Sequence, residues 1–193
     1  MPEFSLKKFI VGALVCGVAL TQTATQLNTQ INNVIMGDNN AIAGDLNKIT
    51  GYLNMIVGNL NLVAGSGNNV RGDMNAILGD LNAIQGYLNA IAGHQNQVSG
   101  MNNMLAGNLN KIAGNLNKIA GNLNLVAGSG NVVGGDRNVI LGDLNAIQGN
   151  LNMISGFMNM IIGMNNKVSG DNNLVVGSGN TVISSSQLRK ANN

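Results

Sequence analysis

Several residue types are scarce in this chain of 193 residues. It contains one cysteine, one proline, one histidine and no tryptophan, and only 9% of its residues are charged. One cysteine excludes a disulfide scaffold, and one proline excludes collagen. Ordinary disorder requires low hydrophobicity and high net charge, whereas 45% of this chain is apolar and its net charge is +2. The chain is instead rich in glycine, with 27 residues, which indicates an internal repeat.

The first residues are typical of a secretory signal peptide. Lys7 and Lys8 precede an apolar run over residues 9–20, which is shorter than the span of about 20 residues that crosses a bilayer. Several small residues follow, so the cleavage site stays open. We assign residues 1–24 to the signal peptide and expect a secreted, extracellular or cell-surface protein. A buried N-terminal helix and an uncleaved anchor are the alternatives.

A heptad repeat fills most of the remaining chain. Glycine stands at every seventh residue from Gly37 to Gly177, which makes 21 consecutive units. With this glycine as position 0, position 3 is always asparagine, and position 5 is Ile or Val in every unit except at Leu105. The array therefore predicts a single domain over residues 25–183, followed by a polar C-terminal tail over residues 184–193.

A period of seven is compatible with a coiled coil or with a β-solenoid. The fixed Asn and Ile/Val are two residues apart, which places them on the same side of a β-strand. In a coiled coil the asparagine would be exposed, and each glycine would cost about 1 kcal/mol relative to alanine. We therefore expect an all-β fold, a β-solenoid in which positions 3 and 5 point inward and positions 2, 4 and 6 point outward.

The inward asparagines are expected to stack into a ladder of side-chain amides. A buried amide without a partner costs about 1–3 kcal/mol, so each must bond to its neighbours along the axis. The candidate core ladder includes Asn40, Asn47, Asn54, Asn61, Asn82, Asn110, Asn117, Asn145 and Asn173.

The number of heptads in one coil is left open by the sequence, with two or three as the alternatives. The segment NLNLVAGSGN occurs at residues 59–68 and again at 122–131, which is 63 residues, or nine heptads, later. Nine heptads are a whole number of coils only if each coil contains three. This observation favours a triangular solenoid, whereas two heptads per coil would give a flattened roll.

The units at residues 167–177, KVSGDNNLVVG, and from Asn173 onward, NLVVGSGNTV, resemble a known repeat. They are similar to the xxNxVxG heptad of the ice-binding, recrystallisation-inhibiting proteins of grasses. The resemblance covers residues 33–183 and is specific at positions 0, 3 and 5. It implies a left-handed β-roll with two heptads per coil, an internal asparagine ladder, and a flat ice-binding face rich in Thr, Ser and Val. At position 4, where that family places ice-facing residues, this chain has threonine only at Thr181.

Catalytic and metal-binding chemistry has little support, and we expect no enzyme, no cofactor and no small-molecule substrate. His94 and all seven aspartates of the array occupy position 1, immediately after the glycine, which is typical of a solvated bend. Aspartates recur in pairs seven residues apart, as at Asp38 and Asp45, but one per coil supplies too few oxygens for calcium. The sparse cations give no indication of nucleic-acid binding.

Outward apolar residues are the most distinctive functional feature. Position 2 is leucine in ten units, and ribbons of such leucines would form a surface that needs a partner. The candidate assembly face is Leu46, Leu53, Leu60, Leu81, Leu88, Leu109, Leu116, Leu123, Leu144 and Leu151. Burial of positions 2 and 4 inside a thicker monomer is the alternative to exposure.

Three functions follow from these features. Our first hypothesis is a secreted structural protein that forms homo-oligomers, filaments, a surface layer or a matrix. The first alternative is ice binding, and the second is an adhesin or coat that contacts a hydrophobic surface or a cell wall.

Overall fold

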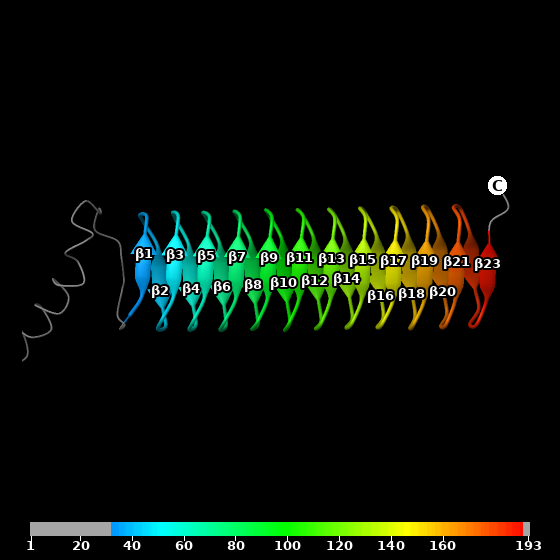
Figure 1. Cartoon of the computed structure of the whole chain (residues 1–193), viewed down its shortest axis with the longest axis horizontal. Helices are drawn as coiled ribbons and strands as arrows, with labels where there is room; N and C mark the ends of the chain where they lie inside the picture. The colour runs from blue at the N-terminus through cyan, green and yellow to red at the C-terminus, as the bar shows by residue number, and fades with distance from the viewer. Residues whose placement is uncertain (1–31, 191–193) are drawn as a thin grey trace, which may run out of the picture.

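The computed structural model describes residues 32–190, so the predicted signal peptide lies outside the described residues. The described chain is entirely β structure, wound into one straight stack of coils from β1 to β23 (Figure 1). Every strand has three residues. The strands are β1 Val34–Met36, β2 Ala41–Ala43, β3 Lys48–Thr50, β4 Met55–Val57, β5 Leu62–Ala64, β6 Asn69–Arg71, β7 Ala76–Leu78, β8 Ala83–Gln85, β9 Ala90–Ala92, β10 Gln97–Ser99, β11 Met104–Ala106 and β12 Lys111–Ala113. They continue as β13 Lys118–Ala120, β14 Leu125–Ala127, β15 Val132–Gly134, β16 Val139–Leu141, β17 Ala146–Gln148, β18 Met153–Ser155, β19 Met160–Ile162, β20 Lys167–Ser169, β21 Leu174–Val176, β22 Thr181–Ile183 and β23 Leu188–Lys190.

Two heptads make one coil. The odd-numbered strands form one parallel sheet of 12 strands, and the even-numbered strands form a second of 11. Each residue pairs with the one 14 positions away, as Ile49 does with Ile35 and Val63. The β-solenoid prediction is therefore confirmed, and the coiled coil is wrong. The 14-residue pairing also confirms two heptads per coil and makes the alternative of three wrong, so the nine-heptad duplication is not a whole number of coils.

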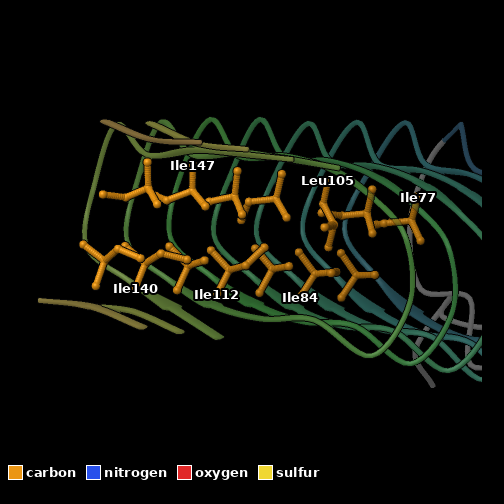
Figure 2. Close-up of a cluster of buried hydrophobic side chains, with 14 of the residues drawn as sticks. Ile77, Ile84, Leu105, Ile112, Ile140 and Ile147 are labelled. Carbon is orange, nitrogen blue, oxygen red and sulfur yellow. The ribbon is translucent and has the colours of Figure 1, made fainter. Parts of the chain in front are cut away.

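The core is a thin double layer of aliphatic side chains. Position 5 is 0–3% exposed in every unit from Ile42 to Val182. Figure 2 shows the two rows, with Ile77, Leu105 and Ile147 from one sheet facing Ile84, Ile112 and Ile140 from the other. Each coil contributes only two such side chains, so burial of the core depends on stacking of neighbouring coils.

The asparagine ladder supplies the polar half of the core and is confirmed in detail. In a typical rung, Nδ2 of Asn54 donates to Oδ1 of Asn40 over 3.0 Å and to the carbonyl of Gly65 over 2.8 Å. Its Oδ1 accepts both the backbone N–H and the Nδ2 of Asn68, each over 3.0 Å. These four bonds use both donors and both acceptor sites of the amide, so every interior rung is satisfied.

Glycine is required at position 0 by close approach as well as by backbone conformation. Gly93 has φ of 140°, and a Cβ atom at this residue would collide with the carbonyl of Gly107 in the next coil. The same collision recurs from coil to coil. The invariant glycine is therefore a consequence of the tight stacking at each corner.

The solenoid extends further toward the C-terminus than the sequence indicated. Residues 184–190 form one more heptad that ends in β23, where a polar tail was expected. All three fixed positions are altered in it, because Ser184 replaces glycine, Gln187 replaces asparagine, and Arg189 takes the register of Val175. Gln187 still donates its N–H to Oδ1 of Asn173 over 2.9 Å.

We expect Asn103→Ala to lower the free energy of unfolding by about 3 kcal/mol or more. Oδ1 of Asn103 accepts the backbone N–H and the Nδ2 of Asn117, and its Nδ2 donates to the carbonyl of Gly114. Removal of the amide leaves several buried groups without partners, at about 1–3 kcal/mol each. Urea denaturation measures the change. Asn69→Ala, at an exposed position 4, is the control, and an equal loss in both variants would contradict the ladder's role.

We expect the triple variant Ser184→Gly, Gln187→Asn and Arg189→Val to associate end to end. The variant restores the repeat consensus in the last coil and turns it into a template for another coil. Sedimentation velocity should show species that grow with protein concentration. Arg137→Leu, which removes one exposed cation elsewhere, is the control. A triple variant that sediments like the parent would show that this coil does not oppose association.

Candidate binding faces

Each sheet presents its positions 4 and 6 on one broad face of the roll. Face A is the outer surface of the even-numbered strands β2–β22, and face B that of the odd-numbered strands β1–β23. Alternation along each strand places position 5 inside and positions 4 and 6 outside, and most strands accordingly show exposed, buried and exposed residues in turn. Outward side chains form a grid of about 4.8 Å across strands and about 6.6 Å along them.

Face B is the more apolar of the two. Between β3 and β21 its outward polar residues are Lys48, Thr50, Lys118 and Gln148. The four successive strands β5, β7, β9 and β11 carry only apolar outward residues, namely Leu62, Ala64, Ala76, Leu78, Ala90, Ala92, Met104 and Ala106. These residues line a shallow hollow of about 480 Å³. Face B thus contains an uninterrupted apolar region over the third to sixth of its 12 strands.

Face A is more polar, and its polar residues gather on neighbouring strands. A second hollow, of about 270 Å³, lies over β6, β8 and β10. Its outward lining residues are Asn69, Arg71, Ala83, Gln85, Gln97 and Ser99. The same coils therefore present an apolar hollow on face B and a polar hollow on face A.

The leucines of the predicted assembly face do not lie on a single surface. Loops that lead into face A carry Leu53, Leu81, Leu109, Leu123 and Leu151, and loops that lead into face B carry Leu46, Leu60, Leu88, Leu116 and Leu144. The two sets of loops run along opposite edges of the roll (Figure 1). Leucines seven residues apart thus lie on opposite edges, and neighbours in a ribbon are 14 residues apart. The leucines themselves are 48–67% exposed, so the alternative of a buried position 2 is wrong as well.

Position 2 lies in a left-handed corner and not on a strand. From Asn39 to Ser186, the non-glycine residues there have φ between 53° and 60°. This conformation costs an ordinary L-residue about 1–2 kcal/mol, and asparagine or glycine tolerates it better. Ten leucines are therefore retained at a conformational cost. Leu60, between Leu46 and Met74, is 49% exposed, whereas Leu116, between Asn102 and Gly130, is 65% exposed.

A second hydrogen-bonded ladder, which we did not predict, runs along position 1. Where the position-1 residue 14 places later is Asp, Asn, Ser or His, its side chain accepts the backbone N–H of the earlier position-1 residue, as Oδ1 of Asp73 does from Asn59 over 2.7 Å. Asp, Asn, Ser and His serve as acceptors, whereas Tyr87 and Phe157 accept no such bond within the described chain. The confinement of all array aspartates to position 1 was the signal for it.

The sequence-predicted bend residues do not gather into a metal site among residues 32–190. Aspartates seven residues apart, such as Asp38 and Asp45, lie on opposite edges of the roll. The imidazole of His94 lies beside Asp80, with Nδ1 3.2 Å from Oδ2, and both side chains are about half exposed. No three His, Cys, Asp or Glu side chains of the described part gather into a metal site. None of its elements is a helix that could cross a membrane.

Comparison with known proteins identifies one family. The model of a family described as the grass antifreeze beta roll matches residues 21–107 and again residues 101–177. No curated protein matches the chain. Among solved structures, UDP-N-acetylglucosamine O-acyltransferase from Moraxella catarrhalis is similar at 15% identity and a TM-score of 0.22. The match covers 84% of this chain and 66% of that one, just under two thirds of its length, and carries no argument at so low a score.

The family match confirms the resemblance drawn from the heptad. It describes an antifreeze roll and not an enzyme family, and it supports ice binding better than the self-assembling structural role that we placed first. Assembly, the signal peptide and the extracellular location stay predictions.

We expect Leu116→Asn to raise the free energy of unfolding by about 0.5–1 kcal/mol. Asparagine tolerates the left-handed conformation better, and Leu116 has no leucine neighbour on its edge to lose. Leu60→Asn is the matched comparison, because Leu60 stands between Leu46 and Met74 and would give up apolar contacts. Urea denaturation of both variants tests this. Equal effects would show that stacking along the edges contributes nothing to stability.

Proposed function

Because the chain belongs to the grass antifreeze beta-roll family, we propose that it binds ice and inhibits recrystallisation through face B. The observation that carries this assignment is the run of apolar outward residues on β5, β7, β9 and β11. It makes face B the surface that contacts the ice crystal.

Rigidity supports the proposal. The outward side chains of face B are held on strands whose backbones are bonded to both neighbours, with a buried ladder and an aliphatic row beneath them. A surface that is already ordered loses little conformational entropy when it binds. A periodic grid is the kind of surface that can match a crystal lattice over many repeats, and the weak contribution of each coil then adds along the roll.

The side-chain chemistry of face B favours it over face A. Water next to short apolar side chains has restricted orientations, and five of the eight residues in the apolar region are alanine. Charged side chains bind water strongly, so long cationic side chains would hold hydration water away from ice-like positions. Face A carries Arg71, Lys111 and Lys167, whereas the apolar region of face B lies between Lys48 and Lys118 without a charge.

We place this activity outside the cell and regard the protein as a binder without catalytic function. The basic and apolar N-terminal segment supports secretion. Growing ice is the partner, and neither a cofactor nor a small-molecule substrate is needed.

Self-assembly is a second candidate, favoured by the exposed leucines on both edges. Leucine at a left-handed corner is conformationally costly, so contacts made by its side chain must compensate. Neighbouring leucines along the edge supply part of these contacts. A second protein molecule could supply the remaining contacts. The test is to replace by asparagine all the leucines of one edge, which are Leu46, Leu60, Leu88, Leu116 and Leu144. Loss of oligomers in sedimentation velocity would support assembly, and an unchanged monomer would contradict it.

We expect Ala90→Lys to raise the concentration needed to inhibit ice recrystallisation by about tenfold or more, equivalent to about 1.4 kcal/mol. Ala90 is at position 4 of β9, in the middle of the apolar region. Lysine already occurs at position 4 of face B, at Lys48 and Lys118, so the substitution is compatible with the fold. A recrystallisation assay in frozen sucrose measures the change.

Ala83→Lys is the matched control, because Ala83 occupies the same position one heptad earlier, on face A. Its activity should equal that of the parent. Loss of activity in Ala83→Lys and not in Ala90→Lys would move the ice contact to face A. A parent protein without recrystallisation inhibition would reject ice binding itself.

A further inference from the structure

The polar hollow on face A is not explained by ice binding on face B. Strands β6, β8 and β10 are consecutive in the sheet, and their outward residues are aligned by register. Position 4 runs Asn69, Ala83, Gln97, and position 6 runs Arg71, Gln85, Ser99. Five of these six residues are polar. On one side, the next strand β4 presents Met55 and Val57, whereas on the other side β12 presents Lys111 and Ala113. Polar outward residues recur on β18, β20 and β22, but no other three successive strands of face A carry five of them.

These side chains have free hydrogen-bonding capacity. In residues 32–190, the protein forms hydrogen bonds with the backbones of Asn69, Arg71, Gln85, Gln97 and Ser99 but not with their side chains. Arg71 forms no ion pair in that part of the chain. Three amides, a hydroxyl and a guanidinium thus surround the small Ala83, at the floor of a hollow of about 270 Å³.

The internal duplication shows that the repeat itself does not demand this cluster. Residues 63 places later are Val132, Gly134, Ala146, Gln148, Met160 and Ile162. Four of the five polar side chains thus have apolar counterparts or glycine in the second copy, at the same repeat positions. The same strands form in the second copy without these four polar groups. The fold therefore does not require polar residues at these positions.

The chemistry of the cluster defines its ligand. Arg71 on β6 and Lys111 on β12, the strand that follows β10 in the sheet, are cationic, and no outward position of face A between β2 and β22 is acidic. Guanidinium recognises carboxylate through paired hydrogen bonds, and amides and hydroxyls can both donate to and accept from sugar hydroxyls. We propose that this hollow binds an acidic polysaccharide, a chain of sugars that carry carboxylate groups.

Nucleic acid fits the hollow less well. Proteins that bind single strands stack bases on aromatic side chains and neutralise many phosphates. The aromatic residues of the described chain, Tyr52, Tyr87 and Phe157, are all at position 1 on the edges, and face A has three cations along its whole length. A linear glycan instead needs a few charges and many neutral polar groups, and it can cross successive strands in one direction.

Isothermal titration calorimetry with polygalacturonate tests the proposal on the full chain. We expect binding that weakens as salt is added, and no heat with the neutral polymer dextran. Arg71→Ala should weaken the affinity by about tenfold or more, since a hydrogen bond to a charged group is lost. Alanine is common at position 6, as at Ala43 and Ala113, so this variant should fold, and its circular dichroism checks that.

Lys167→Ala is the matched control, because it removes one cation from face A outside the hollow. It should bind polygalacturonate like the parent. An equal loss in both variants would show a general attraction of charge and overturn the site. Equal binding of dextran, or no binding of polygalacturonate, would overturn the ligand class. Recrystallisation inhibition should be unchanged in Arg71→Ala, because Arg71 is not on face B.

Discussion

One buried amide in every heptad holds the stack together. The position-3 asparagine links three consecutive coils, since its Oδ1 binds the next rung, its Nδ2 binds the previous one, and its second N–H reaches the carbonyl of a glycine at the corner. A buried amide is tolerated in a core only when all its hydrogen-bond donors and acceptors have partners. This requirement fixes the length of a coil, because only a shift of one whole coil returns an amide to the correct position.

The remaining invariants follow from this ladder. The acceptor of the second N–H is the carbonyl of a position-0 glycine, and a side chain on the glycine one coil earlier would occupy the space around that carbonyl. Position 5 then lies two residues from the asparagine, where it fills the only space left between the two sheets with Ile or Val. Positions 1, 2, 4 and 6 are free to vary because none of them enters the core. Outward residues can therefore change to create binding functions on the faces without disturbing the fold.

The sequence was sufficient to predict what the interior requires. Invariance at positions 0, 3 and 5 identified the β-solenoid, the inward asparagines and the exposed bend at position 1, because these depend on spacing alone. Two heptads per coil could not be derived, since the number of strands in a coil depends on how sharply the corner turns. That turn is made by the left-handed residue at position 2, such as Leu46 with φ of 60°. Leucine gives no conformational hint of such a corner, in contrast to asparagine or glycine.

Because the number of heptads per coil was unknown, the sequence also grouped the outward residues incorrectly. Without the number of heptads in a coil, Leu46, Leu53 and Leu60 look like one ribbon, whereas the alternate leucine lies on the far edge. Likewise, the apolar residues of face B and the polar residues of face A are mixed in the sequence, heptad by heptad. The two groups separate only when odd-numbered and even-numbered strands are considered as two sheets. Ala90, for example, is on β9 of face B, whereas Gln97, one heptad later, is on β10 of face A. The sequence shows the chemistry of each outward side chain, but assigning these side chains to faces requires the number of heptads in one coil.

The odd number of heptads in the duplicated block has a further consequence. A block of nine heptads contains four and a half coils, so every residue of the first copy has its counterpart on the opposite face of the second. Leu62 on face B corresponds to Leu125 on face A, and Arg71 on face A corresponds to Gly134 on face B. The apolar region and the polar hollow both lie in the first copy, and most of their outward residues differ from their counterparts 63 residues later. The two copies thus share the repeat pattern at positions 0, 3 and 5 and differ at outward positions, which is where a function carried by an existing fold is expected.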